Sequence, residues 1–226
     1  MPTKPYVVQK GDSLFQIGRR LGVVPEGIYL LNRLTSDELQ IGQILQIPSY
    51  VEAQTVREDV PVYRWENTEG EIWGRVHAGT RFEVMDTTEQ FFQVMYLRKI
   101  GYLNRKDAQI LVYDHQVPVI SVLGYYTEAE GERFPSSEKT FMENTDVLTQ
   151  TALFFWRLDP GWPVLIEYFA DASPRYVENL VWEGHRNNVR MQGVIHNLMY
   201  NVPEESAQTV EIALANPERR QALVES

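Results

Sequence analysis

The side chains that most often carry chemistry in proteins are scattered along this 226-residue chain. Its four histidines, His77, His115, His185 and His196, show no H-E-x-x-H or similar ligand spacing, so we expect no metal site. The chain has no cysteine, which excludes a thiol nucleophile, a disulfide and a Cys-based zinc site. It also has no G-x-S-x-G, Walker-type or G-x-G-x-x-G element. The sequence therefore predicts no catalytic residue and no cofactor.

The composition is that of an acidic protein with an ordinary apolar fraction. The chain is 43% hydrophobic and 23% charged, and its formal net charge is −10. This charge repels nucleic acid and anionic lipid, so we expect neither as a partner. It does not exclude a neutral glycan, which is held by hydrogen bonds and apolar contacts. No apolar run approaches the roughly 18 residues of a membrane span, and the N-terminus shows no recognisable signal peptide.

The first 50 residues mix short strands with two short helices. A strand start, YVV, leads through a Gly-Asp turn into a helix whose apolar face is formed by Leu14, Ile17 and Leu21. Pro25 suits the first turn of a second helix, which Asn32 closes. The stretch LQIGQILQIP then returns as a strand. The pattern predicts the order strand, helix, helix, strand.

This segment resembles the LysM family in three stretches, YVVQKGDSLFQIGRRLGV, LLNRL and LQIGQILQIP. Gly18 departs from the family, which usually has Ala there, and is expected to weaken the helix by up to about 1 kcal/mol. The resemblance implies a domain over residues 1–50 that binds peptidoglycan or another N-acetylglucosamine polymer.

The resemblance also places a glycan groove between the loop after the first strand and the loop before the last. Backbone amides in tight turns can pair with acetamido groups, while Leu14 and Ile41 can cover the acetyl methyls. For Asp12 and Asn32, a purely local role in the turn and the cap is an equally good interpretation. The candidate glycan-binding residues are Gly11, Asp12, Ser13, Leu14, Asn32, Leu39, Gln40, Ile41 and Gly42.

Residues 51–111 contain short, closely spaced runs that alternate apolar and polar side chains, such as VPVYRW, TRFEVMD and FFQVMYL. Such spacing favours a small β-barrel. The AGT stretch, the FF pair and the GY stretch resemble a bacterial SH3-like domain. Four aromatic side chains could bind a wall peptide, although packing in the barrel is the preferred interpretation: Tyr63, Trp65, Trp73 and Tyr96.

Residues 112–226 alternate apolar strands with helical patterns, which indicates a parallel sheet. Strands are expected at VPVISVLGYYTE, TALFFWRL and VRMQGVIHNLMYN. Helices are expected from Ser136 to about Thr149, from Ser173 and from about Glu205. The stretches LGYYTE, TALFFWRL and VIHNLMYN resemble the opening units of a glycoside hydrolase family 18 barrel, of the kind found in spore cortex-lytic N-acetylglucosaminidases. The predicted fold class is multidomain, α+β followed by α/β.

The family 18 catalytic motif, D-x-x-D-x-D-x-E on the fourth strand, is absent. The chain stops at Ser226, where that strand should begin, so we expect an incomplete barrel of about three βα units. Its third strand, apolar at Val194, Ile195, Leu198 and Met199, would leave an unpaired edge that could pair with a second copy. Side chains that could line sugar subsites, or else pack in the core, are Tyr125, Tyr126, Trp156 and Asn197.

Three functions fit these patterns. The preferred one is a peptidoglycan-binding protein of the bacterial cell wall or of the spore cortex or coat. The second is the N-terminal fragment of a spore cortex-lytic N-acetylglucosaminidase whose catalytic motif lies beyond Ser226. The third is a structural protein of the spore coat. A D-x-x-D-x-D-x-E motif soon after Ser226 would establish the second, and release of muropeptides would separate hydrolysis from binding.

Overall fold

The computed structural model describes residues 4–113, 120–127, 136–158, 166–168, 172–197, 210–211 and 214–225. The chain divides into two compact units. The first comprises Met1–Ile120 with the short segment His185–Asn188, and the second comprises Ser121–Gly184 with Val189–Ser226. The predicted segments 1–50 and 51–111 therefore lie in the same unit.

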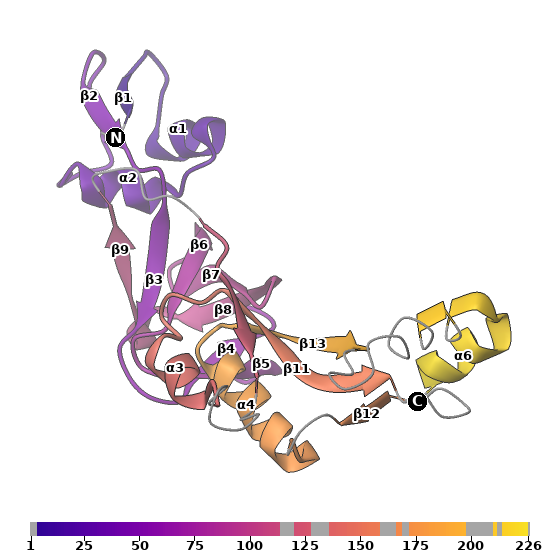
Figure 1. The fold of residues 1–226 in the computed structure, drawn as a ribbon. Helices are drawn as coiled ribbons and strands as arrows, with labels where there is room; N and C mark the ends of the chain where they lie inside the picture. The colour runs from indigo at the N-terminus through magenta and orange to yellow at the C-terminus, as the bar shows by residue number, and fades with distance from the viewer. Residues whose placement is uncertain are drawn as a thin grey trace. The chain divides into compact units, whose positions relative to one another are not determined.

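The first 50 residues form a two-stranded sheet and two helices (Figure 1). Strand β1 (Lys4–Val7) pairs antiparallel with β2 (Ile44–Ile47), while α1 (Leu14–Leu21) and α2 (Pro25–Leu31) lie between them in sequence. This is the predicted order of strand, helix, helix and strand. The core that joins these elements consists of Val8, Leu14, Ile17, Ile28, Leu45 and Ile47.

Local sequence explains where α1 begins and ends. The Ser13 hydroxyl accepts a hydrogen bond from the backbone N–H of Gln16 at 3.2 Å, which caps the first turn. Gly22 adopts a left-handed φ of 69° and ends the helix. Inside the helix, a Cβ at Gly18 would lie 2.6 Å from the carbonyl oxygen of Val23. The tight turn after α1 thus requires the glycine that departs from the family pattern.

Seven antiparallel strands follow, as expected for closely spaced alternating runs. They pair in the order β5-β4-β8-β7-β6-β3-β9, and β5 and β9 at the two ends of this order do not pair with each other. The described residues therefore form no closed barrel. The prediction of a small barrel is corrected to a seven-stranded antiparallel sheet. The strands are β3 (Val51–Thr55), β4 (Val60–Tyr63), β5 (Ile72–Val76), β6 (Arg81–Thr87), β7 (Phe91–Tyr96), β8 (Lys99–Asn104) and β9 (Ala108–Val112), with a 3-10 turn η1 (Arg105–Asp107) before β9.

In the second unit, three parallel strands confirm the predicted strand arrangement. Strand β11 (Gln150–Leu158) pairs with β10 (Leu123–Tyr126) on one side and with β13 (Arg190–His196) on the other. A strand that the sequence did not predict, β12 (Ile166–Tyr168), pairs antiparallel with the end of β11. Among the described strands, β13 pairs only with β11.

The helices of this unit are α3 (Glu138–Glu143), α4 (Pro174–Arg186) and α6 (Pro217–Glu225). The predicted helix from Ser136 to about Thr149 was too long, because the chain turns at Asn144 and enters β11 at Gln150. Helix α4 confirms the predicted start near Ser173. Leu198, Met199 and the predicted helix start at Glu205 lie outside the described residues. No helix that the structure describes is long and apolar enough to cross a membrane.

Candidate functional site

The two loops predicted to form a groove lie side by side at one end of the β1–β2 sheet. The ladder continues past the strands, since Val8 donates to the Gln43 carbonyl at 2.9 Å and accepts from the Gly42 amide at 2.8 Å. Gly11 and Gly42 each have a φ of 88°, a backbone conformation that favours glycine. The antiparallel pairing therefore brings residues 11–14 and 39–42 to the same end of the domain.

The Asp12 carboxylate holds the first loop. One of its oxygens accepts hydrogen bonds from the Tyr6 hydroxyl at 2.6 Å and the Gln9 amide at 2.8 Å, and the other accepts from the Arg20 guanidinium at 2.9 Å. These bonds, led by the one from Tyr6, lower the pKa of Asp12 below its ordinary range. The side chain is only 4% exposed. Asp12 therefore shapes the loop, as the local interpretation held.

Asn32 has a comparable local role at the end of α2. Its amide nitrogen donates to the carbonyls of Ile28 and Gln46, both at 2.8 Å, and its oxygen accepts from the Gln46 amide at 2.7 Å. Both polar atoms of the side chain thus tie the helix to β2. Asn32 therefore fixes the base of the second loop, and both hydrogens of its side-chain amide are used in these bonds.

The remaining candidates divide between buried and exposed positions. Leu14 is buried and Leu39 packs against the same core. Gln40 donates its amide to the Gln43 side chain at 3.0 Å and accepts from the Gln43 amide at 3.0 Å, which closes a tight turn. Ile41, at the tip of that turn, is 71% exposed. Of the predicted apolar pair, only Ile41 presents its side chain to solvent.

A hollow of about 700 Å³ opens beside the first loop, and we call it the LysM hollow because the segment that lines it resembles the LysM family. Besides Ser13 and Leu14, it is lined by Thr35–Asp37, upstream of the predicted residues 39–42. Two aromatic rings, Phe15 and Tyr29, lie among its polar groups. Such a mixed lining suits a ligand with both apolar and hydroxyl faces. The full lining is Ser13–Phe15, Pro25, Glu26, Tyr29 and Thr35–Asp37.

Sequence reasoning missed Phe15, Tyr29 and Thr35–Asp37. For Phe15 a signal existed, because a residue between the apolar-face positions 14 and 17 points away from the core of an amphipathic helix. For Thr35–Asp37 the sequence offered none. The left-handed φ of 50° at Arg33 and the bond from the Leu34 amide to the Tyr29 carbonyl at 3.1 Å set the path of this segment.

Residues 6–48 match the family model described as LysM domain. This segment is a LysM domain. It implies binding of peptidoglycan or a chitin-like N-acetylglucosamine polymer, and hence an association with the cell wall. A comparison with curated proteins gave no match.

Two solved structures of spore cortex-lytic enzymes named SleL are similar to the chain at low identity. The enzyme from Bacillus cereus is 15% identical with a TM-score of 0.38, covering 100% of this chain and 47% of that one. The enzyme from Bacillus megaterium QM B1551 is 17% identical with a TM-score of 0.35, covering 98% and 46%. The chain therefore spans about half the length of these enzymes. At these TM-scores the likeness carries no argument about activity.

The four residues proposed for sugar subsites in the second unit do not form one surface. Tyr126 is buried, and its hydroxyl lies 2.5 Å from that of Tyr176. Tyr125, the preceding residue of β10, is exposed, because neighbouring strand residues point to opposite faces. Trp156 is half-buried beside Gly193, and Asn197 directly follows β13. Tyr126 thus packs in the core, which was the alternative interpretation.

The four aromatic side chains proposed to bind a wall peptide differ in their exposure to solvent. Tyr96 is buried, donates its hydroxyl to the His185 carbonyl at 3.1 Å, and has its pKa raised to about 12 by that burial. Trp65 and Trp73 flank the guanidinium of Arg64, at 5.2 and 5.1 Å from the ring centres. Only these two tryptophans remain candidates for contacting a wall peptide, together with the half-buried Tyr63.

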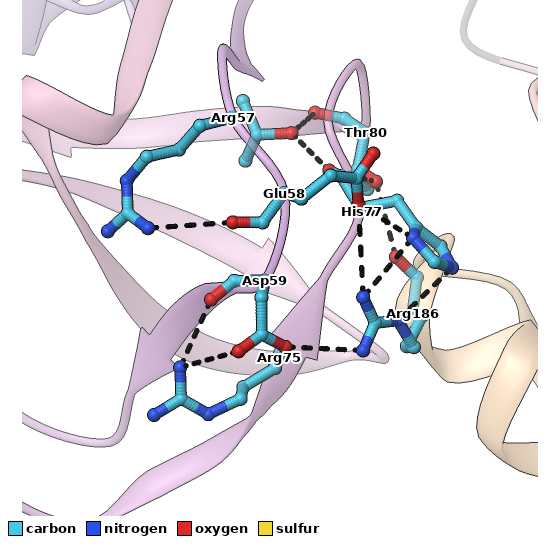
Figure 2. Close-up of polar contacts among 8 residues, drawn as sticks. Arg57, Glu58, Asp59, Arg75, His77, Thr80 and Arg186 are labelled. Carbon is cyan, nitrogen blue, oxygen red and sulfur yellow. Dashed lines mark hydrogen bonds and ion pairs between the residues drawn. The ribbon is translucent and has the colours of Figure 1, made fainter.

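A cluster of charged groups in the first unit surrounds Arg186 (Figure 2). Arg186 donates to Asp59 at 3.2 Å and to the His77 ring at 3.1 Å, and His77 in turn lies 2.9 Å from Glu58. This contact with His77 is the main cause that lowers the pKa of Glu58. Within the described residues no three His, Cys, Asp or Glu side chains gather as metal ligands. The contacts of the cluster tie Arg186 to Glu58, Asp59 and His77.

Proposed function

We propose that this protein binds peptidoglycan or a related N-acetylglucosamine polymer in the LysM hollow. The observation that carries the proposal is the match of residues 6–48 to the LysM family, together with a hollow that the first loop of that domain lines. Asp12 and Asn32 hold the two loops in place, and the exposed residues that line the hollow contact the glycan. Ile41 and the turn at residues 39–42 extend this surface at the same end of the domain.

The chemistry of the hollow supports a neutral sugar ligand. The Phe15 and Tyr29 rings and Pro25 offer apolar surface to the C–H faces of the sugar and to acetyl methyls. The hydroxyls of Ser13, Thr35 and Ser36 and the carboxylate of Asp37 offer hydrogen bonds to hydroxyl and acetamido groups. A site of this kind gains orientation from few polar groups and affinity from apolar contact.

A sedimentation assay with purified, insoluble peptidoglycan tests the proposal on the full chain. Thr35→Trp places a bulky ring at an exposed position that lines the hollow, and we expect it to reduce retention strongly. Ile44→Trp is the matched control, because Ile44 is exposed and lies outside the lining of the hollow. Equal retention of both variants, with folding intact by circular dichroism, would refute the assignment of the hollow.

Enzymatic release of muropeptides by the same samples tests the alternative of an N-acetylglucosaminidase fragment. We expect retention without release, because no catalytic motif is present in the chain. A location in the spore cortex or coat, an SH3-like domain over 51–111 and a family 18-like segment over 112–226 remain proposals that rest on sequence resemblance. Immunolocalisation in sporulating and vegetative cells separates cortex from vegetative wall.

Self-association through the outer edge of β13 belongs to the same proposal. Among the described strands, β13 has a partner on one side only, and Ile195 on it is exposed. An unpaired strand edge offers backbone groups to a second chain. Sedimentation velocity over a range of concentrations tests this: dimers that Ile195→Lys disrupts would support it, and a monomer at all concentrations would exclude it.

A further inference from the structure

A second cleft of about 460 Å³ lies in the same unit, between α1 of the LysM domain and β6 of the sheet. We call it the β6 cleft. Phe15 and Pro25 line both this cleft and the LysM hollow, so the two adjoin at these residues. The side chains that give the β6 cleft its chemistry are Phe15, Arg19, Tyr50, Glu83, Met85 and Asp86.

Phe15 stands at the junction of the two hollows and is 65% exposed. The residues beside it on the helix, Leu14 and Ile17, supply the buried apolar face, so Phe15 adds nothing to that core. In the part of the chain that the structure describes, no aromatic ring or cation is placed against it. A flat apolar ring exposed between two polar-rimmed hollows is a platform on which the C–H face of a sugar can lie.

The polar groups of the β6 cleft suit a ligand rich in hydroxyls. Arg19 comes from α1, while Glu83 and Asp86 come from β6. Across residues 4–113 neither Arg19 nor Glu83 has an ion-pair partner. Burial, followed by the nearby charges of Glu52 and Glu83, raises the pKa of Tyr50, whose hydroxyl can both donate and accept a hydrogen bond. The cleft thus offers two carboxylates that accept and two groups that donate.

The two walls of the cleft are held in a fixed relation. Val24, in the turn after α1, belongs to the hydrophobic core of the seven-stranded sheet. Glu26 at the start of α2 pairs with Arg105 through two hydrogen bonds of 2.5 and 2.8 Å. Gly27 approaches Val51 so closely that a Cβ would lie 2.6 Å from its side chain. Such pre-formed walls avoid the entropy cost of assembling a site on binding.

We propose that an N-acetylglucosamine glycan longer than the LysM hollow runs over Phe15 into the β6 cleft, which acts as a second subsite. The occupant is the continuation of the same polymer, because the two hollows share Phe15 and Pro25 and differ little in chemistry. This proposal rests on the proposed function. In this arrangement, longer glycans bind more tightly because they also contact residues of the sheet, outside the LysM domain.

Calorimetric titration of the full chain with N-acetylglucosamine oligomers, from dimer to octamer, tests the proposal. Affinity should rise with length until both subsites are filled. The double variant Glu83→Ala/Met85→Ala should bind short oligomers like the wild type but lose about tenfold for the longest ones, because a tethered second segment binds at high effective concentration. Glu83→Gln alone, which keeps the shape of the side chain, should show a smaller loss confined to long oligomers.

Variants of Phe15 test the part of the proposal that concerns the junction of the two hollows. Phe15→Ala should weaken short and long oligomers alike, whereas Phe15→Tyr should retain most of the affinity because it keeps the ring. Ile100→Ala, at an exposed site on β8 outside both hollows, is the control. Absence of binding at every length would overturn the proposed function itself. Binding that is normal in the LysM hollow, with long oligomers unaffected by the β6 variants, would overturn only the second subsite.

Discussion

Gly18→Ala should destabilise the first unit, although alanine is the better helix former. In an exposed helix the change would add about 1 kcal/mol of stability. Here the new methyl would lie 2.6 Å from the Val23 carbonyl oxygen and 3.0 Å from the Pro25 ring. The first contact is with backbone, and no rotamer change can relieve it.

The expected magnitude follows from how firmly that backbone is held. The Val23 amide donates to the Gly18 carbonyl at 3.0 Å, and the adjacent Val24 is buried in the core of the sheet. Overpacking at a site that cannot move typically costs about 1–3 kcal/mol. After subtracting the gain in helix preference of about 1 kcal/mol, we expect a net loss of up to about 2 kcal/mol.

Urea unfolding monitored by tryptophan fluorescence and by hydrogen exchange of the α1 amides measures this loss. The matched control is the pair Gln16→Gly and Gln16→Ala, at an exposed position of the same helix, which reports the alanine preference without the contact. A Gly18→Ala protein that is more stable than the wild type by the difference between those two controls would refute the packing argument. A midpoint lowered while binding per folded molecule is kept would support it.

Three further outcomes are expected. Because the pKa of Asp12 is lowered in the folded state, its carboxylate stabilises the fold fully above the ordinary pKa near 3.8. This stabilisation is lost as pH falls through the lowered pKa. Asp12→Asn should therefore make the melting temperature depend less on pH in the acid range. Asn32→Ala removes the hydrogen bonds that tie α2 to the exposed Gln46 backbone and should cost about 0.5–1.5 kcal/mol in urea unfolding. Affinity for neutral oligomers should stay nearly constant as salt rises from about 0.1 to 1 M, where the Debye length falls from about 10 to 3 Å; a steep decrease would contradict recognition of an uncharged ligand.

The elements of the LysM domain could be predicted because their signals are local. Ser13 at the cap, the left-handed Gly22 and the spacing of Leu14 and Ile17 act within one or two turns of helix. Strand β12, which pairs with the C-terminal end of β11, has only three residues, too few for an alternating pattern to reveal it. The early end of α3 depends on Asn144, whose side chain donates to the Thr140 carbonyl at 2.7 Å and competes with the helix.

The candidate site was predicted less well than the elements, for a related reason. Tyr125 and Tyr126 were both predicted to line sugar subsites or to pack in the core, yet on a strand one side chain is exposed and the next is buried. The wall at Thr35–Asp37 depends on how the loop folds back on α2. Its position follows from three-dimensional packing, which no spacing in the sequence encodes.

The residues by which the LysM resemblance was recognised mostly build the domain rather than meet the glycan. Asp12 and Asn32 spend their polar atoms on the chain itself, and Leu14 lies in the core. This division explains why the motif identifies the family without indicating which glycan is bound. Phe15, exposed at the junction of two hollows, lies outside the core of the domain. Preference for one polymer over another is therefore expected to reside in such exposed positions and in the strand β6 beside them.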